Sequence, residues 1–199
     1  MKKIMGMAAV LVLMLVLPAC GNAEKEVKAS EKVQTEEVQT GETDSDRDGG
    51  ANTYTKDFGS YELPEGWVES REHSNDSQFF YVLEGHERDE MPDNVAVTTG
   101  SNPYAEEEHE KFRDAIMARI TEQISGYEGI ELTGNGSYTA QNYIVYTFTV
   151  KESDPAVTTT QYYIVSDHAY CLVHETNFTG NPEADDAAKL IVDSFIWSR

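Results

Sequence analysis

The 199-residue sequence is poor in cysteine, in basic residues and in long apolar segments, and each shortage excludes a class of protein. Its two cysteines, Cys20 and Cys171, are too few for a disulfide-rich scaffold. Lysine and arginine number 15 against 36 acidic residues, a formal net charge of −21. Nucleic acid is therefore not expected as a partner, because proteins bind it by neutralising phosphates with basic side chains. After the first twenty residues, no stretch is apolar enough to cross a bilayer.

Signatures of catalysis are also missing. The sequence has no G-x-S-x-G nucleophile motif, no glycine-rich phosphate loop followed by a helix and no H-E-x-x-H metal motif. Residues 134–137, Gly-Asn-Gly-Ser, are interpreted as a turn rather than a phosphate loop because no helix follows them. The five histidines do not show the spacing of metal ligands. We therefore expect no enzymatic activity, no cofactor and no metal site.

The first twenty residues have the parts of an export signal. Lys2 and Lys3 are followed by an apolar run at residues 4–17, and the small residue Ala19 stands directly before Cys20. This arrangement resembles the lipobox of bacterial lipoproteins, with Pro18 where Ala, Ser or Thr is usual. The resemblance implies that residues 1–19 are removed and that Cys20 carries acyl chains such as palmitate. The protein would then be anchored by lipid on the extracytoplasmic face of the cell membrane.

Two other interpretations of this segment remain open, plain secretion and a retained membrane helix. The apolar run has 14 residues, which is short of the ~20 that a spanning helix needs. Two acyl chains, by contrast, hold a protein stably without any protein span. Removal of Lys2 and Lys3 with the signal would bring the net charge to −23. Such a charge favours cations or basic protein surfaces as partners, or simply keeps an exported protein soluble.

Residues 20–53 are predicted to form an acidic, flexible tether that begins at the lipidated cysteine. The segment has no aromatic residue and is too polar to bury a core. Asp44, Asp46, Asp48 and Gly49 match the first half of a calcium-binding loop. Position twelve of that loop, however, is Thr55 rather than an acid, and no flanking helices are expected. An acidic linker can produce the same pattern by chance, so calcium binding remains open.

Residues 54–199 hold every aromatic residue of the chain and are predicted to form one domain of the α+β class. A helix is expected to start with Asn102 as its N-cap and Pro103 as its first residue. A closing helix is expected to start in the same way at Asn181 and Pro182, with Ala187, Leu190, Ile191 and Ser194 inward. The first helix would bury a stripe at every fourth position: Phe112, Ile116, Ile120 and Ile124. Strands are expected near residues 58–63, 67–73, 78–84, 94–99, 130–139, 141–152, 157–166 and 169–176.

The order of these elements resembles PsbP-like domains. The strand followed by Pro64-Glu65-Gly66-Trp67, the apolar hairpin segments 163–165 and 170–173, and the closing helix with Ser194-Phe195 are similar to that family. PsbP is an extrinsic subunit of the photosynthetic oxygen-evolving complex, and many bacterial lipoproteins share its fold. The resemblance implies an antiparallel sheet between helices, an αβα sandwich, over about residues 58–197. It carries no catalytic residues.

Three groups of side chains are candidates for binding or reactivity. The first is a set of strand tyrosines that would either form a binding surface or, as we favour, pack beneath a helix: Tyr143, Tyr146, Tyr162, Tyr163 and Tyr170. The second is a charged loop that would hold a cation weakly or, as we favour, simply be solvated: His86 with Glu84, Glu87, Asp89, Glu90 and Asp93. The third is Cys171, expected to be an inert buried thiol, since strand parity places His174 on the opposite face.

The function that the sequence favours is that of a membrane-anchored extracytoplasmic lipoprotein, a non-catalytic binding module of unknown ligand. The alternative is an accessory or assembly subunit of a cell-envelope protein complex. The partners expected on either interpretation are the membrane, through the lipid anchor, and an envelope protein.

Overall fold

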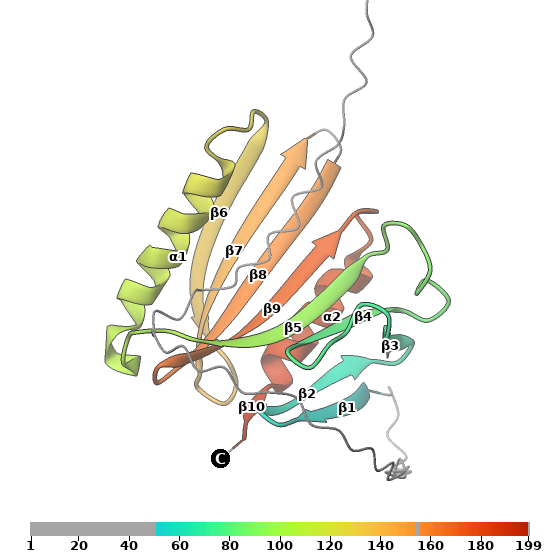
Figure 1. Ribbon diagram of the computed structural model, residues 1–199, viewed down its shortest axis with the longest axis horizontal. Helices are drawn as coiled ribbons and strands as arrows, with labels where there is room; N and C mark the ends of the chain where they lie inside the picture. The colour runs from blue at the N-terminus through green and yellow to red at the C-terminus, as the bar shows by residue number, and fades with distance from the viewer. Residues whose placement is uncertain (1–50, 154–155, 199) are drawn as a thin grey trace, which may run out of the picture.

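A computed structural model describes residues 51–153 and 156–198 (Figure 1). Cys20, the predicted signal peptide and the calcium-like segment with Asp44, Asp46 and Asp48 lie outside the described residues. Within them, no helix is both long and apolar enough to span a membrane.

Most strands belong to one seven-stranded antiparallel sheet, in the order β3-β4-β5-β9-β8-β7-β6. Hairpins join β3 to β4, β6 to β7, β7 to β8 and β8 to β9. Antiparallel pairing of consecutive strands is expected where the connections are short. The strands are β3 (Trp67–Glu69), β4 (Gln78–Leu83), β5 (Asn94–Ser101), β6 (Ile130–Tyr138), β7 (Ile144–Ser153), β8 (Ala156–Ser166) and β9 (Ala169–Asn177).

A second, three-stranded sheet was not anticipated from the sequence. It consists of β1 (Ala51–Lys56), β2 (Gly59–Pro64) and β10 (Ile196–Trp197), with β2 in the centre. β1 therefore begins three residues before Tyr54, within the segment predicted to be tether. β1 has no alternating apolar pattern because five of its six side chains are polar or small, which leaves little signal for a strand.

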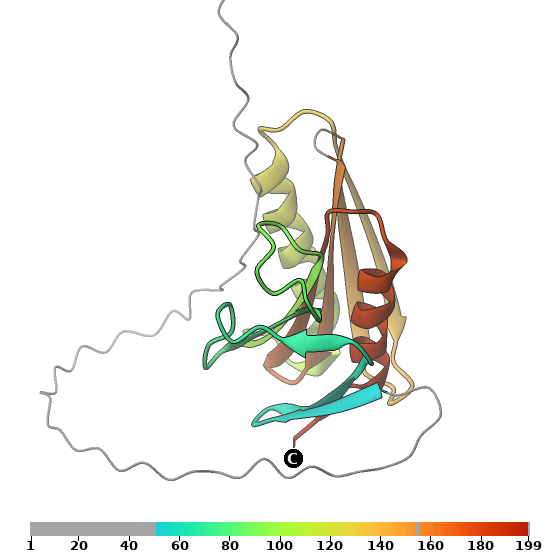
Figure 2. The ribbon, with the colours of Figure 1, turned by 90° about the vertical axis from the view of Figure 1, so that its right-hand side faces the viewer.

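The two main helices lie on opposite sides of the large sheet, as Figure 2 shows. α1 (His109–Ile124) follows a short 3-10 turn, η1 (Glu106–Glu108), and α2 (Pro182–Ser194) closes the domain before β10. This arrangement confirms the α+β class with helices on both faces of an antiparallel sheet.

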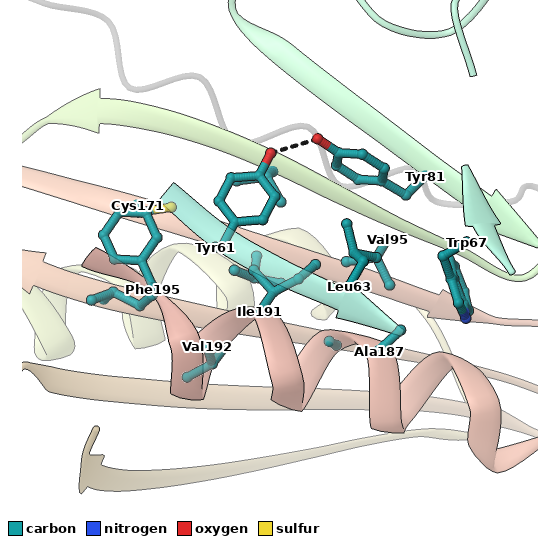
Figure 3. Packing of buried hydrophobic residues seen from close by; sticks show 14 of the residues in the cluster. Tyr61, Leu63, Trp67, Tyr81, Val95, Cys171, Ala187, Ile191, Val192 and Phe195 are labelled. Atoms are coloured by element: carbon teal, nitrogen blue, oxygen red, sulfur yellow. Dashed lines mark hydrogen bonds between the residues drawn. The ribbon is translucent and has the colours of Figure 1, made fainter. Parts of the chain in front are cut away.

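α2 and β2 together cover one face of the large sheet (Figure 3). Their shared core contains Tyr61, Leu63, Trp67, Ile191 and Phe195, all at most 2% exposed. The hydroxyls of Tyr61 and Tyr81 are hydrogen-bonded at 2.6 Å, so the polar ends of two buried rings satisfy each other. α2 starts as predicted, because the Asn181 side chain accepts a hydrogen bond from the Glu183 N–H at 3.3 Å and Pro182 follows it.

α1 covers part of the opposite face. The predicted stripe is confirmed at Phe112, Ile116 and Ile120, which are at most 2% exposed, while Ile124 is half-buried. These side chains pack on Tyr163, Phe148 and their neighbours from β7, β8 and β9. The helix thus occupies one side of this face, over β6 and β7 (Figure 1).

The predicted start of α1 was wrong. Asn102 does not cap the helix: its side chain accepts from the Tyr104 N–H and donates to the Ala169 carbonyl, and its backbone N–H bonds His168 O. The chain from Asn102 to Tyr104 is thus held against the β8–β9 turn, and α1 begins only at His109. Asn102 is therefore used for contacts with the β8–β9 turn and not for the N-cap of α1.

The segment 134–137 is not a turn but the middle of β6. A Cβ on Gly134 would lie 2.8 Å from Met117 Cε, and one on Gly136 would lie 3.2 Å from the Tyr146 ring. These glycines are needed for the close approach of α1 and of a β7 ring to the strand. The turn comes later, where Asn142 has a φ of 66°.

Candidate functional site

The five strand tyrosines do not gather on one surface. Tyr143 and Tyr162 pack against the core beneath α2, whereas Tyr146, Tyr163 and Tyr170 belong to the core beneath α1. Burial raises the pKa of Tyr163 and Tyr170, as expected for rings enclosed in apolar surroundings. The interpretation as packing beneath helices is confirmed, and these tyrosines do not form a shared binding face.

The charged loop between β4 and β5 is largely solvated. His86 Nδ1 lies 2.7 Å from Asp89 Oδ2, and both side chains are more than half exposed. Asp93 has a structural role instead, because its carboxylate accepts from the Phe178 N–H at 2.6 Å and the Thr179 N–H at 3.1 Å. Among the described residues, no group of three or more His, Cys, Asp or Glu side chains could hold a metal ion.

Cys171 is fully buried in the core beneath α2, and burial alone raises the pKa of its thiol. His174 lies on the opposite face of β9, as parity requires. A buried thiol with a raised pKa and no neighbouring base is a poor nucleophile. The structure therefore agrees with an inert, space-filling Cys171.

The part of the α1 face over β4, β5 and the C-terminal half of β9, beyond the α1 contacts at Tyr170 and Leu172, carries no helix in the ranges that the structure describes (Figures 1 and 2). The strand registers place a transverse row of side chains there. Gln161 on β8 is opposite His174 on β9, His174 is opposite Ala96 on β5, and Ala96 is opposite Phe80 on β4. We call these four residues the Gln161–His174 row. It is the candidate functional site.

Gln161 is the most unusual member of the row. Its side chain is 1% exposed, its Oε1 accepts from the Tyr163 hydroxyl at 2.9 Å, and its Nε2 has no hydrogen-bond partner. A buried donor without an acceptor costs about 1–3 kcal/mol. Gln123, on the same side of the sheet in α1, has a buried Oε1 that is likewise without a donor. This side of the domain therefore contains one buried donor and one buried acceptor that have no partner among the described residues.

His174 is the second polar member. It is half-buried, and burial lowers its pKa to about 4, so the imidazole is neutral at physiological pH. A neutral imidazole offers one donor and one acceptor. At the far end of the row the His73 ring lies 5.1 Å from the Phe80 ring, centroid to centroid. The row thus combines uncharged polar groups with a flat aromatic surface.

A pair of acids lies on the opposite face of β9, beneath α2. Glu175 is 0% exposed, and neither of its carboxylate oxygens has a hydrogen-bond donor, which is an unfavourable state for an ionised acid. Burial, and then the neighbouring Asp185, raise the pKa of Glu175, while the interaction with Glu175 lowers the pKa of Asp185. The uncharged, protonated form of Glu175 is therefore the one that this buried position favours.

The arrangement supports binding better than catalysis. Ser70 Oγ and His73 Nδ1 are 2.8 Å apart, a contact that resembles a nucleophile with its base. Ser70 is only 3% exposed, however, and the Ser70 carbonyl accepts from the backbone N–H groups of His73 and Ser74. The contact therefore closes the turn after β3. The Gln161–His174 row can hydrogen-bond and stack on an uncharged ligand.

Sequence reasoning missed Gln161, His174 and the Glu175–Asp185 pair. The sequence does contain a signal that places Gln161 beside His174. The two-residue turn Asp167-His168 pairs Ser166 with Ala169, and counting back along both strands places Gln161 opposite His174. Glu175 meets Asp185 only through the packing of α2, which no local pattern specifies.

Comparisons with known proteins support the fold. No protein-family model matches the sequence, and no curated protein sequence does either. The structure is similar to cyanobacterial PsbP (CyanoP) from Synechocystis sp. PCC 6803, with a TM-score of 0.51 and 12% identity, over 79% of this chain and 98% of that one. It also matches a Bacteroides thetaiotaomicron VPI-5482 protein, with a TM-score of 0.43 and 12% identity, over 71% of this chain and 46% of that one. The domain thus has a PsbP-like α+β fold.

Proposed function

We propose that this chain is a lipid-anchored extracytoplasmic binding module that has no chemistry of its own and takes its ligand on the Gln161–His174 row. The observation that carries the proposal is the unpartnered, buried amide donor of Gln161. A ligand acceptor would remove the cost of leaving that donor unpaired. The neutral His174 and the Phe80 ring beside it favour an uncharged ligand with carbonyl or hydroxyl groups, such as a peptide backbone or a sugar.

Thermal-shift screening with uncharged peptides and neutral oligosaccharides tests this proposal. A ligand that binds only the folded chain stabilises it by about 2.7 kcal/mol at a concentration one hundred times its Kd. This stabilisation raises the melting temperature. The shift is expected to disappear in Gln161→Leu, which is of similar size and removes the amide donor together with the acceptor for the Tyr163 hydroxyl. It is expected to persist in Tyr127→Leu, which changes an exposed residue remote from the row in sequence. Equal shifts in the wild type and in Gln161→Leu would place the ligand elsewhere.

The anchoring part of the proposal rests on Cys20. Replacement Cys20→Ala is expected to move the protein from the membrane fraction to the medium, or to leave an uncleaved precursor, because the acyl chains have no other attachment point. Fractionation followed by intact-mass spectrometry measures both outcomes. Processed, membrane-bound Cys20→Ala protein would contradict lipidation at this residue.

The second candidate function is an accessory subunit of an envelope complex. The sequence resemblance to PsbP-like domains favours it, because that resemblance implies kinship with an extrinsic subunit, although a fold alone does not determine function. Purification of the native protein from its own membranes distinguishes the two. A stoichiometric protein partner supports the accessory role, and ligand binding by the isolated monomer supports the binding module.

A further inference from the structure

β6 is a long strand, and no other strand of residues 51–153 and 156–198 pairs with its outer edge. It stands at the end of the seven-stranded sheet with nine residues, whereas β3 at the other end has three. Proteins usually protect such edges with proline, lysine or a covering segment, because open N–H and C=O groups recruit other strands. β6 contains neither proline nor lysine, and Glu131 is its one charged residue.

The hydrogen-bond pattern shows which backbone groups face outward. Thr139 N–H donates to Tyr143 O at 2.9 Å, which makes these residues a hydrogen-bonded pair in the β6–β7 register. Hydrogen-bonded and non-hydrogen-bonded pairs alternate along an antiparallel ladder. The odd-numbered residues of β6 therefore bond to β7, and the N–H and C=O groups of the even-numbered residues point away from the sheet.

The side chains of this edge leave it accessible. Tyr138 is 64% exposed, and residues 133–137 are all exposed. Gly136 N–H donates to the Asn135 side chain at 2.9 Å, which agrees with its outward direction. This exposed side chain has to turn away before Gly136 can pair with another strand. The N–H groups of Leu132, Gly134 and Tyr138 face outward in the same way.

We propose that β6 pairs antiparallel with β6 of a second copy of this chain, about a two-fold axis at Gly134. This register pairs all nine residues of each strand. Its hydrogen-bonded pairs all consist of even-numbered residues, whose N–H and C=O groups point away from the sheet. It places Tyr138 opposite Ile130 of the partner subunit, which covers an exposed ring with an apolar side chain. Such isologous contacts are the commonest form of assembly in soluble oligomers.

Charge explains why a second copy would meet at this edge. The chain carries a net charge of −21, so most surfaces of two copies repel each other. Along β6 the one charge, Glu131, would face Ser137 of the partner subunit, and no like charges would stand opposite each other. The dimer is therefore expected to tighten as salt rises, since screening shortens to about 10 Å at 0.1 M and weakens the remaining repulsion.

Sedimentation equilibrium of the full chain in density-matched detergent tests the pairing. The register places Thr133 opposite Asn135 of the partner subunit, and both side chains are exposed. The double variant Thr133→Lys with Asn135→Lys puts like charges face to face twice and is expected to raise the dimer Kd about tenfold or more. The matched variant Thr133→Lys with Asn135→Glu puts opposite charges there, keeps the net charge of the chain and is expected to bind at least as tightly as the wild type.

Each other result overturns the proposal. A wild type that stays monomeric at every concentration would show that the edge does not recruit a second copy, and would leave an extended segment of another protein as its occupant. A dimer that the two-lysine variant does not weaken uses another surface. Loss of the dimer in both variants contradicts this register. The outcome is independent of ligand binding at the Gln161–His174 row, which belongs to other strands.

Discussion

Replacing Glu175 by Gln is expected to stabilise the protein at alkaline pH and to remove most of the fall in its stability between about pH 6.5 and about pH 8.5. Glu175 is fully buried, and burial together with Asp185 raises its pKa from 4.5 to about 9. Across this window the folded protein holds a proton that the unfolded chain has released. Stability then falls as pH rises, by about 1.4 kcal/mol per pH unit for one such group.

The groups around the acid fix the sign of this effect. Lys189 lowers the pKa of both acids, Lys151 lowers that of Asp185, and the nearby Thr160 hydroxyl lowers that of Glu175, but burial and the Asp185 carboxylate outweigh them at Glu175. His174 on the other face has a pKa lowered to about 4, so it destabilises the fold only as pH falls below 6.5. Cys171, whose pKa is raised by burial, adds a fall of the same sign only as pH approaches its ordinary value of 9.0. The slope just above about pH 6.5 therefore reports Glu175.

Urea unfolding of the full chain at a series of pH values measures the difference. Glu175→Gln is uncharged at every pH, so its free energy of unfolding should be nearly flat across the window. Asp186→Asn, a change of the same charge at an exposed position on α2, should keep the wild-type slope. Parallel curves for the wild type and Glu175→Gln would show that Glu175 does not hold a proton in the folded state.

Ile120→Ala is expected to lower the free energy of unfolding by about 2–5 kcal/mol, the range for a large-to-small change in a packed core. Ile120 is 0% exposed and lies in the α1 stripe against the sheet. Neighbouring helix positions cannot fill the space, because Phe112 and Ile116 are themselves packed on the strands. The same variant should leave α2 and its core in place.

Thr121→Ala is the matched control, since it changes the next residue of the helix at an exposed position. Its effect should stay within about 0.5 kcal/mol. Chemical unfolding of both variants gives the comparison directly. A loss below about 0.5 kcal/mol for Ile120→Ala would mean that the buried face of α1 has been assigned wrongly.

The features that sequence reasoning predicted are those with a strong local pattern. The apolar stripe at every fourth position from Phe112 to Ile120 is confirmed, and so is the cap at Asn181 with Pro182. Both patterns could be predicted because periodicity and capping act within a single helix. Alternation in the strands and short connections were enough to predict the antiparallel sheet. The short turn at Asp167 and His168 also determines the register that defines the site.

The features that were wrong or missed depend on contacts between distant segments. Asn102 has every local property of an N-cap, but it bonds the β9 backbone at Ala169 instead. Gly134 and Gly136 have the composition of a turn, yet they lie in a strand because Met117 and Tyr146 need the space. Glu175 and Asp185 become neighbours only when α2 packs on β9. In each case the tertiary structure overrides the local preference.

Photo-cross-linking in native membranes shows whether the Gln161–His174 row is a binding surface. A photoreactive residue at Thr176, two residues beyond His174 on the same face, is expected to give a specific adduct that mass spectrometry identifies. The same probe at Asp186, exposed on α2 on the other side of the sheet, should give none. Equal adducts from both positions, or none from Thr176, would contradict the account.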